Sequence, residues 1–588
     1  MTDLRWHGWG YADKTYSFGH RPDALDFLRV ALELRGDEAF PACDLDAIRL
    51  RAPRLTSAQL SALRHIVPET KTDTRTRILH AYGKAYPDLI RLRRGEIPHP
   101  PDAVAYPATE DQVTRVIAFC AHAHADFALI PFGGGTSAVG GVEPRDARVT
   151  ITLDLARLNR VLTLDEVSQT ATIETGILGP DLERELNARG FTLWHLPQSF
   201  EFSTLGGWIA TCGAGLASTK YGKIEALTQG IRVATPRGIV ETRAVPATRL
   251  LQLLVGSEGT LGVITRATMR VHRLPKKRDY GALLFKNMSA GIAALRMMLQ
   301  NGTIPATVCL SDEDATRTFR AFAPREQARG WQAVAEQIGE SFIAARGYSF
   351  DQGALMILGF EDDASGARAG QAICKSHGAL GLRRGVADAW LRDWYETPYR
   401  RDALLDRGIL VDTLETATTW SNLERLHKIV LETIKQAAAE TGARALVMTQ
   451  ISHACRDGAS LDVTYLARMA RAAEGQGAAA PLLAQLEAIK RAAIECIIAN
   501  RGTVSRHHGI GHAHAAWMDR EVGATPALAV TAGASVGLDA LRAAKNALDP
   551  NNVMNPGKWL APEPRLADIA IEHQERFWNL PSKGTADI

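Results

Sequence analysis

The sequence is poor in the features that mark disulfide-rich or zinc-binding proteins. Its seven cysteines are scattered singly, and no two of them form a C-x-x-C pair. This pattern argues against both a disulfide framework and a zinc site, so we expect no metal. Free cysteines are typical of a reducing compartment, and we expect the protein to be cytoplasmic.

Long apolar runs and an excess of one charge are also missing. No stretch approaches the roughly 18 apolar residues of a membrane-spanning helix, and the first residues lack the apolar core of a secretory signal. The formal net charge is +3, from 68 basic and 65 acidic residues. Such a balance gives no sign of a surface for nucleic acid.

The length of 588 residues is too great for one hydrophobic core, so we expect several packed units. A proline-rich link around residues 97–101 and a basic stretch at 276–278 indicate boundaries. We predict a helical N-terminal segment (1–96), a glycine-rich domain (97–275), a domain of antiparallel sheet backed by helices (276–500), and a C-terminal segment (501–588).

Periodicity predicts a mixed α+β protein. Apolar residues recur at helical spacing in 23–34, 57–66 (with a Ser57 cap), 109–123, 180–189, 290–299, 326–339, 478–500 and 538–548. Strands are expected at 127–130, 149–153, 161–164, 169–174, 281–285, 355–360, 445–451 and 461–465. The order of these elements is not the regular alternation of a doubly wound parallel sheet.

A run of three glycines follows the strand expected at 127–130. Consecutive glycines suit a backbone that turns sharply and brings its N–H groups close to an anion, for which we expect a phosphate. The run lacks both the Gly-Lys-Ser/Thr of triphosphate loops and the G-x-G-x-x-G of dinucleotide folds. The segment consists of Pro131, Phe132, Gly133, Gly134, Gly135, Thr136 and Ser137.

Two more segments rich in glycine and hydroxyl side chains lie in the same predicted domain, at 195–215 and 256–264. Dense small residues let the backbone pass against a large flat ligand, and free N–H groups can serve its polar edges. Three such segments predict a ligand longer than a mononucleotide, such as an extended dinucleotide.

Four histidines gather near the C-terminus, at positions 507, 508, 512 and 514. Their spacing lacks the cysteine or carboxylate partners that zinc sites usually add. Structural histidines and a metal site remain alternatives, but the neighbouring glycines favour a loop facing a cofactor. We expect acid or base catalysis, with His507 as the first candidate.

Several motifs resemble one known family. The segments 131–137, 199–209 and 256–264 are similar to the FAD-binding domain of vanillyl-alcohol-oxidase-type flavoproteins. Within that family, the stretches 5–11, 202–208, 220–225, 235–238 and Glu415-Thr416 near Trp420 resemble alkyldihydroxyacetonephosphate synthases. The resemblance implies a two-part FAD-binding domain with an antiparallel-sheet cap over the substrate, and covers nearly the whole chain.

The resemblance also implies where FAD is held. The loop Pro131–Ser137 would bind its pyrophosphate, and the loop contains no His or Cys, which implies FAD that is not covalently attached. The other implied contacts are Gln198, Ser199, Phe200, Glu201, Phe202, Ser203, Thr204, Thr211, Cys212, Gly213, Ala214, Glu258, Gly259, Thr260, Leu261, Gly262, Val263 and Ile264.

Four implied catalytic residues follow from the same resemblance: Arg401, His507, His508 and Asp462. A guanidinium at Arg401 suits a phosphate or carboxylate. Asp462 stands where the synthases have a catalytic tyrosine, and we expect the nearby Tyr465 to lie on the opposite face of its strand. The chain departs from the family pattern in two further places, where Cys309 and Arg506 replace an arginine and a histidine.

The resemblance implies an enzyme that exchanges an acyl group for a fatty alcohol on acyl-dihydroxyacetone phosphate, a step of ether-lipid synthesis. The alternative is an FAD-dependent oxidoreductase acting on a 2-hydroxy acid or alcohol. A third reading is a flavin- or lipid-binding protein without catalysis. We expect a small-molecule or lipid-like substrate and no nucleic-acid partner. Peripheral contact with a membrane and a homodimer are further possibilities that we consider.

Overall fold

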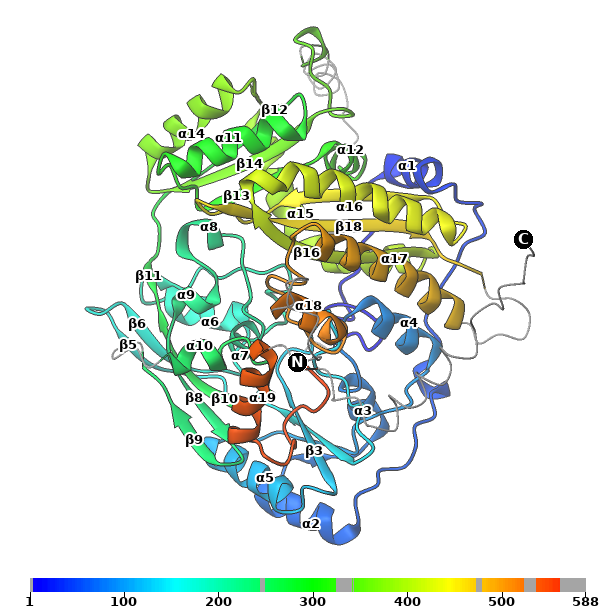
Figure 1. Ribbon diagram of the computed structural model, residues 1–588, viewed down its shortest axis with the longest axis vertical. Helices are drawn as coiled ribbons and strands as arrows, with labels where there is room; N and C mark the ends of the chain where they lie inside the picture. Colours follow the sequence, from blue (N-terminus) through cyan, green and yellow to red (C-terminus); the bar gives the residue numbers. More distant parts are fainter. Residues whose placement is uncertain are drawn as a thin grey trace, which may run out of the picture.

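The computed structural model describes residues 4–243, 249–323, 341, 343–471, 479–522 and 536–560. The sheets of these residues fall into two regions. The glycine-rich region, whose strands lie at 70–71 and within 103–273, forms the lower part of Figure 1, and the cap region (278–468) forms the upper part. Strand β11 ends at Arg273 and β12 begins at Arg278, so the chain passes from one set of sheets to the other there. The predicted domain boundaries themselves stay predictions.

The glycine-rich region contains two main sheets and a two-stranded ribbon. A four-stranded sheet has the order β1-β2-β4-β3, with β4 parallel to both of its neighbours. A five-stranded antiparallel sheet has the order β5-β6-β10-β8-β9. The strands are β1 (Thr70–Lys71), β2 (Ala103–Ala105), β3 (Phe127–Phe132), β4 (Val149–Asp154), β5 (Val161–Asp165), β6 (Thr170–Glu174), β7 (Phe191–Thr192), β8 (Thr228–Thr235), β9 (Gly238–Glu241), β10 (Val263–Arg270) and β11 (His272–Arg273).

The helices of this half begin in the N-terminal segment, where α4 ends at Gly95 in the left-handed conformation. Leu63 of α2 packs into the same core as Val113 and Val116 of α5, beside the four-stranded sheet. The helices are α1 (Pro22–Leu32), α2 (Ser57–Ile66), α3 (Thr74–Leu79), α4 (Tyr86–Arg94), α5 (Glu110–His122), α6 (Gly179–Asn187), α7 (Leu205–Ala210), α8 (Ser218–Tyr221), α9 (Ile224–Leu227) and α10 (Leu250–Leu254), with a 3₁₀ turn at Leu45–Ala47.

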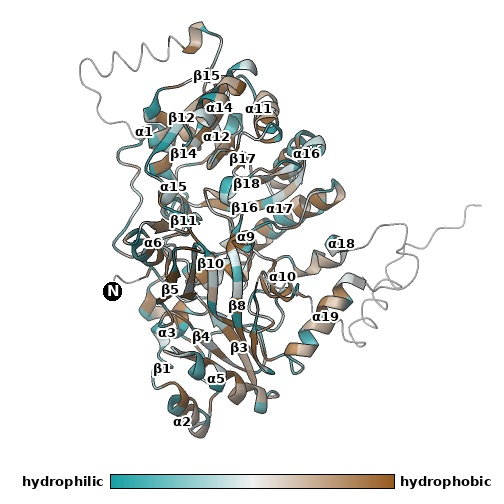
Figure 2. Cartoon of the chain, turned by 90° about the vertical axis from the view of Figure 1, so that its left-hand side faces the viewer, coloured by the Kyte–Doolittle hydropathy of each residue, from teal (hydrophilic) through white to brown (hydrophobic). Residues whose placement is uncertain are grey.

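The cap region is built on a seven-stranded antiparallel sheet of order β15-β12-β14-β13-β17-β18-β16. Helices α16 and α17 lie side by side across one face of it (Figure 1). Figure 2 shows hydrophobic and hydrophilic colours alternating along α16, as expected of an amphipathic helix. The strands are β12 (Arg278–Phe285), β13 (Thr307–Ser311), β14 (Ala354–Glu361), β15 (Leu380–Gly381), β16 (Ile409–Thr419), β17 (Ala445–Ile451) and β18 (Gly458–Arg468).

The remaining helices complete the cap and return the chain to the first region. Met554 forms a parallel bridge with Leu129 of β3, so the end of the described chain is anchored on the four-stranded sheet. These helices are α11 (Met288–Gln300), α12 (Glu313–Ala321), α14 (Ala364–Ser376), α15 (Arg384–Leu405), α16 (Trp420–Glu440), α17 (Ala480–Ala499), α18 (Met518–Val522) and α19 (Val536–Leu548), with a 3₁₀ turn at Ala515–Trp517.

The α+β fold class and the antiparallel cap sheet are confirmed. One detail of the sequence interpretation is wrong: helix α2 is capped by Thr56, which forms a capping box with Gln59, and Ser57 is its first helical residue. The expected helix at 326–339 lies outside the described residues. A membrane span is not among the described helices, since none is both long and apolar enough.

Candidate functional site

A cavity of about 360 Å³ lies between the two regions. Its first wall comes from the turn after β3, the segments around α7 and the turn before β10. Its second wall comes from α12, α15 and the cap strands β16, β17 and β18. The loop that carries His507 and His508 closes the space between the two walls. The three glycine-rich segments found in the sequence therefore meet at one site.

The triple glycine is required by close packing against residues 202–204 and by the backbone conformation of Gly135. A Cβ atom at Gly134 would lie 1.8 Å from the carbonyl oxygen of Phe202, and one at Gly133 would lie 2.3 Å from Thr204 Oγ1. Gly135 has a φ of 65°, which favours glycine. The amides of Gly134, Gly135 and Thr136 donate no hydrogen bond to another residue of the described chain. They are free to bind an anion at the cavity wall.

The predicted cofactor residues divide into two groups. All of Pro131–Ser137 lines the cavity, together with Gln198, Ser199, Thr204, Thr211, Gly213, Ala214, Glu258, Gly259, Gly262 and Ile264. The others are absent from the lining and belong to the structure around it: Phe200, Glu201, Phe202, Ser203, Cys212, Thr260, Leu261 and Val263. For example, Ser203 Oγ accepts a hydrogen bond of 2.7 Å from Trp208 Nε1, and Phe202 packs against the rings of Trp9 and Tyr399.

Glu258 fixes one half of the histidine loop. Its backbone has a φ of 51°, and its buried carboxylate accepts the amides of Ile510 and Gly511 at 2.5 and 2.7 Å. Burial raises the pKa of Glu258 to about 7, although both amides oppose this shift. The glycine-rich region thus positions this part of the loop through a side chain that also lines the cavity.

Glu415 of β16 fixes the other half of the loop. Its Oε1 accepts Ser505 Oγ at 2.8 Å and the amides of Arg506, His507 and His508 at 3.1, 2.7 and 2.6 Å. Burial acts to raise the pKa of Glu415, but the His507 and His508 rings and these hydrogen bonds hold it well below its ordinary value. Glu415 is therefore an ionised carboxylate inside the protein.

His507 is the histidine that Glu415 orients most directly. Its Nδ1 atom lies in very close contact with Glu415 Oε2, and its side chain is 14% exposed toward the cavity. Burial acts to lower the pKa of His507, but the Glu415 carboxylate outweighs it and leaves the pKa raised. Because Nδ1 is held by Glu415, the ring presents Nε2 as the nitrogen that can exchange a proton.

His508 lies further from the same carboxylate. Its Nδ1 is 3.7 Å from Glu415 Oε1, and burial lowers the pKa of His508 to about 4, so it is neutral at ordinary pH. Glu415, His507 and His508 could together offer three ligand atoms within 4.8 Å of one another. We assign no metal to them, because Glu415 Oε1 is already filled by four donors and Oε2 by His507. His512 and His514 lie beyond this group, where His512 Nε2 is 3.0 Å from Glu143 Oε2.

Arg401 stands in the second wall of the cavity, on α15. Its guanidinium lies 5.9 Å from the centre of the Trp9 ring and 3.4 Å from Thr413 Oγ1. Among the described residues, no carboxylate lies within ion-pair distance of it, whereas the neighbouring Arg400 pairs with Asp393 at 2.7 Å. Burial lowers the pKa of Arg401. A half-buried guanidinium without a counter-ion suits an anionic group of a ligand.

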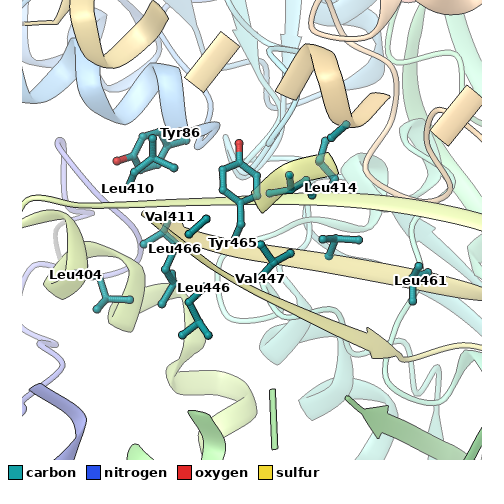
Figure 3. Packing of buried hydrophobic residues seen from close by; sticks show 14 of the residues in the cluster. Tyr86, Leu404, Leu410, Val411, Leu414, Leu446, Val447, Leu461, Tyr465 and Leu466 are labelled. Carbon is teal, nitrogen blue, oxygen red and sulfur yellow. The ribbon is translucent and has the colours of Figure 1, made fainter. Parts of the chain in front are cut away.

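Asp462 of β18 also faces the cavity, and it is the cross-strand partner of Glu415. Tyr465 lies on the opposite face of the strand, as expected, where its hydroxyl is 3.3 Å from Asp412 Oδ2. Figure 3 shows the Tyr465 ring on the side of the strands where Tyr86 lies, and Leu466 on the other side. Tyr465 therefore cannot substitute for a catalytic group at position 462.

The two other departures from the family pattern lie close to the site. Cys309 is buried in β13, where burial raises the pKa of its thiol to about 12, so it remains protonated. Arg506 donates its amide to Glu415 and accepts Lys223 Nζ at its carbonyl oxygen at 3.0 Å. Position 309 therefore lacks the guanidinium of the family pattern, and position 506 lacks its imidazole.

Sequence reasoning did not assign several residues of this site. Ser452, His453 and Trp9 line the cavity, and Glu415, named before only as part of a motif, holds the histidine loop. A carboxylate within the apolar run 409–417 was a signal for Glu415, since a buried charge needs a partner. Ser452 and His453 carried no comparable signal.

Models of known families match the two regions in turn. Residues 101–243 match the FAD binding domain, and residues 274–559 match the C-terminal domain of FAD linked oxidases. The free amides of the glycine loop and the cavity beside them fit the pyrophosphate and the rings of such a cofactor. The fold and the site define a flavoprotein of the vanillyl-alcohol-oxidase type, an enzyme whose cofactor is FAD.

Individual relatives narrow the assignment. Alkyldihydroxyacetonephosphate synthase of Trypanosoma brucei brucei is 33% identical, over 90% of this chain and 84% of its own. A solved structure of an alkyldihydroxyacetonephosphate synthase has a TM-score of 0.77 at 29% identity and covers 94% of this chain and 98% of its own. Glycolate oxidase subunit GlcD of Bacillus subtilis is 26% identical over 80% of this chain and 91% of its own. The chain belongs to the alkyldihydroxyacetonephosphate synthase family.

Proposed function

We propose that this enzyme exchanges the acyl group of an acyl-dihydroxyacetone phosphate for a fatty alcohol, giving an alkyl ether and a free fatty acid. One observation carries the proposal: a half-buried arginine without a carboxylate partner, Arg401, lines the same cavity as His507 and the glycine loop. The cavity thus offers an anion-binding group, a proton-transferring group and a cofactor wall. The synthase relatives support this choice of substrate.

Each residue has a role that its surroundings support. Arg401 binds the phosphate of the substrate, because no carboxylate of the described residues pairs with its guanidinium. His507 takes and returns a proton at Nε2, while Glu415 holds Nδ1 and stabilises the charged ring. FAD, when bound, supplies an electron acceptor beside the substrate carbon. The free amides and the glycines of the first wall would hold the cofactor.

The exchange requires no net oxidation, and this property separates it from the alternative. An oxidoreductase acting on a 2-hydroxy acid could use the same Arg401 for the substrate carboxylate and the same His507 as base. The similarity to the glycolate oxidase subunit of Bacillus subtilis supports that second candidate.

The test is an anaerobic incubation of the FAD-loaded protein with two sets of substrates. With acyl-dihydroxyacetone phosphate and a long-chain alcohol, we expect alkyl ether and fatty acid in equal amounts by mass spectrometry, without lasting loss of flavin absorbance. Lasting bleaching by 2-hydroxy acids, reversed by air, with no ether formed, would favour the oxidoreductase. Inactivity in both sets would favour a binding protein without catalysis.

Three further properties are part of the proposal. FAD is held without a covalent bond, because Pro131–Ser137 contains no His or Cys, and acid precipitation should release all the flavin. The free cysteines support a cytoplasmic location. Contact with a membrane surface would suit a lipid-like substrate and can be checked by vesicle flotation, and a homodimer can be checked by light scattering.

A further inference from the structure

The N-terminal segment contributes a side chain to the cavity, although the matched families begin only at residue 101 of this chain. Residues 4–11 form a closed turn, because Leu4 and Tyr11 are joined by an antiparallel bridge. Within this turn, Trp9 is 6% exposed and lines the same cavity as Arg401. The family matches therefore give Trp9 no role, and its surroundings must supply one.

Asp402, which follows Arg401 in α15, holds this segment in place. Its buried Oδ2 accepts a hydrogen bond of 2.8 Å from the amide of Trp9 and one of 3.0 Å from Arg5 Nη1. A Cβ atom at Gly8 would lie 2.2 Å from the same oxygen, so the turn passes directly against the helix. One helix therefore fixes both Arg401 and the backbone of Trp9.

Trp9 and Arg401 both carry hydrogen-bond donors that lack acceptors. Trp9 Nε1 is buried and has no partner among the described residues. Within the described chain, the Arg401 guanidinium makes one long hydrogen bond, of 3.4 Å to Thr413 Oγ1, and it lies 5.9 Å from the centre of the Trp9 ring. A buried N–H without an acceptor is unfavourable, and most such groups in proteins are satisfied. The two side chains are therefore suited to an acceptor that a ligand brings.

The charges beside these donors favour an anion. Trp9 and Arg401 also line a small hollow beside the cavity, whose lining includes Lys84 and Asp412. Burial lowers the pKa of Lys84 to about 8, so its amine is mostly charged at neutral pH. The Asp412 carboxylate already pairs with Lys490 at 3.2 Å. The hollow holds about 10 Å³, which is no more than one water molecule needs, so a larger anion must lie on the cavity side.

We infer that Trp9 is a substrate-binding residue, which donates its indole N–H to the same oxyanion that Arg401 binds. An indole N–H can only donate, so the group that it serves must be an acceptor. A charged oxygen is the better acceptor, because hydrogen bonds to ionised groups are the stronger ones. The inference rests on the proposed function for the identity of the anion, which is then the phosphate of the substrate. With a 2-hydroxy acid, the same two donors would hold the carboxylate.

Calorimetric titration of the FAD-loaded, full-length protein with inorganic phosphate tests the inference without turnover. Trp9→Phe keeps an aromatic ring but removes the N–H, so we expect Kd for phosphate to rise about tenfold or more, the effect of losing a hydrogen bond to a charged group. Trp6→Phe is the matched control, because it makes the same change in the same segment but at a position absent from the described lining of the cavity. It should bind phosphate as the wild type does. A Kd within twofold of wild type in Trp9→Phe would overturn the inference.

A second replacement separates the N–H from the size of the ring. In benzothienylalanine, sulfur stands in place of the indole N–H, and the shape of the side chain is nearly unchanged. Replacement of Trp9 by this residue should weaken phosphate binding as much as Trp9→Phe does, and it keeps the test open should Trp9→Phe fail to fold. Wild-type affinity in this protein would mean that Trp9 acts by packing alone. With ¹⁵N-labelled tryptophan, the indole signal that this replacement removes should shift when phosphate is added to the wild type.

A parallel titration with glycolate separates this inference from the proposed function. Phosphate binding that depends on Trp9, with weaker binding of glycolate, would support both. Tight binding of glycolate that depends on Trp9, with no binding of phosphate, would keep the role of Trp9 and count against the proposed function. If the wild type binds neither anion, the inference is wrong. In turnover, Trp9→Phe should raise KM for the substrate with little change in kcat, since a binding contact is lost and the proton-transferring His507 is kept.

Discussion

The two walls of the cavity differ in the kinds of side chain that line them. Among the described residues of the glycine-rich wall, Glu258 is the sole ionisable side chain, and the rest of the lining is glycine, hydroxyl, amide and apolar residues. The opposite wall and its histidine loop carry Asp393, Arg400, Arg401, His453, Asp462, His507 and His508. One wall is suited to holding a large cofactor through its backbone, and the other to moving protons and binding anions.

The walls also differ in what a substitution removes. In the first wall several glycines leave no room for a side chain, so added atoms should displace the cofactor or the packing. In the second wall the ionisable groups come from several separate elements, so single substitutions should remove one function and leave FAD in place. The predictions that follow test this difference.

The largest effect is expected at Gly134. Gly134→Ala would put a Cβ atom 1.8 Å from the carbonyl oxygen of Phe202, so the loop must move and lose its shape as an anion site. We expect the purified variant to retain little FAD, as measured from the ratio of flavin to protein absorbance. Gly385→Ala in α15 is the control, since no atom lies within 4 Å of its added Cβ, and it should keep full FAD. Normal FAD content in Gly134→Ala would mean that the loop does not bind the cofactor.

The sequence was sufficient to predict much of the first wall and much less of the second. The glycine segments 131–137 and 256–264 could be recognised because glycine and hydroxyl residues have a local conformational reason for being there. Local periodicity likewise predicted the helices α5 and α17 and the strands β14 and β17. By contrast, α15 was not predicted, because Pro398 and many charged residues interrupt its apolar pattern.

Long-range contacts explain the rest of the difference. His453 bonds to the carbonyl of Gly215, which is 238 positions away in sequence, and His507 contacts Glu415, 92 positions away. No local pattern reports such pairs. The resemblance to the family pointed to Arg401, His507 and Asp462 by position, but the partners that give them their charge states became visible only in the folded chain.

The next largest effect is expected at His507. His507→Gln keeps a polar side chain but removes the group that takes and returns a proton, so kcat should fall by about 10²–10⁴-fold with little change in KM. FAD content should stay normal, because His507 belongs to the second wall. His65→Gln, on the exposed surface of α2, is the matched control and should behave as wild type. A loss of FAD in His507→Gln would contradict the assignment of FAD binding to the first wall and of proton transfer to the second.

Arg401 should affect binding more than turnover. Arg401→Met removes the guanidinium while keeping a long side chain against Trp9, and we expect KM for the phosphate-bearing substrate to rise about tenfold or more. Inorganic phosphate should inhibit the wild type and lose this effect in the variant. If KM is unchanged and kcat falls instead, Arg401 acts in the chemical step and the assignment of the phosphate site is wrong.

The smallest and most specific effect is expected from Glu415→Gln, which keeps the shape of the side chain. In the wild type the Glu415 carboxylate raises the pKa of His507, so the ring keeps its charge as the pH rises past 6.5. The stabilisation from this pair is complete below pH 6.5, the pKa of the unfolded state, and is lost as the pH rises through the raised pKa of the folded state.

In the variant the ring should lose its proton at a lower pH. The limb of the kcat profile that reports His507 should therefore move to lower pH, and histidine NMR should follow the same change. FAD content should not move, since Glu258 still binds the amides of Ile510 and Gly511 from the first wall. A fall in FAD content without a shift of the His507 titration would mean that Glu415 supports the cofactor wall and not the proton-transferring one.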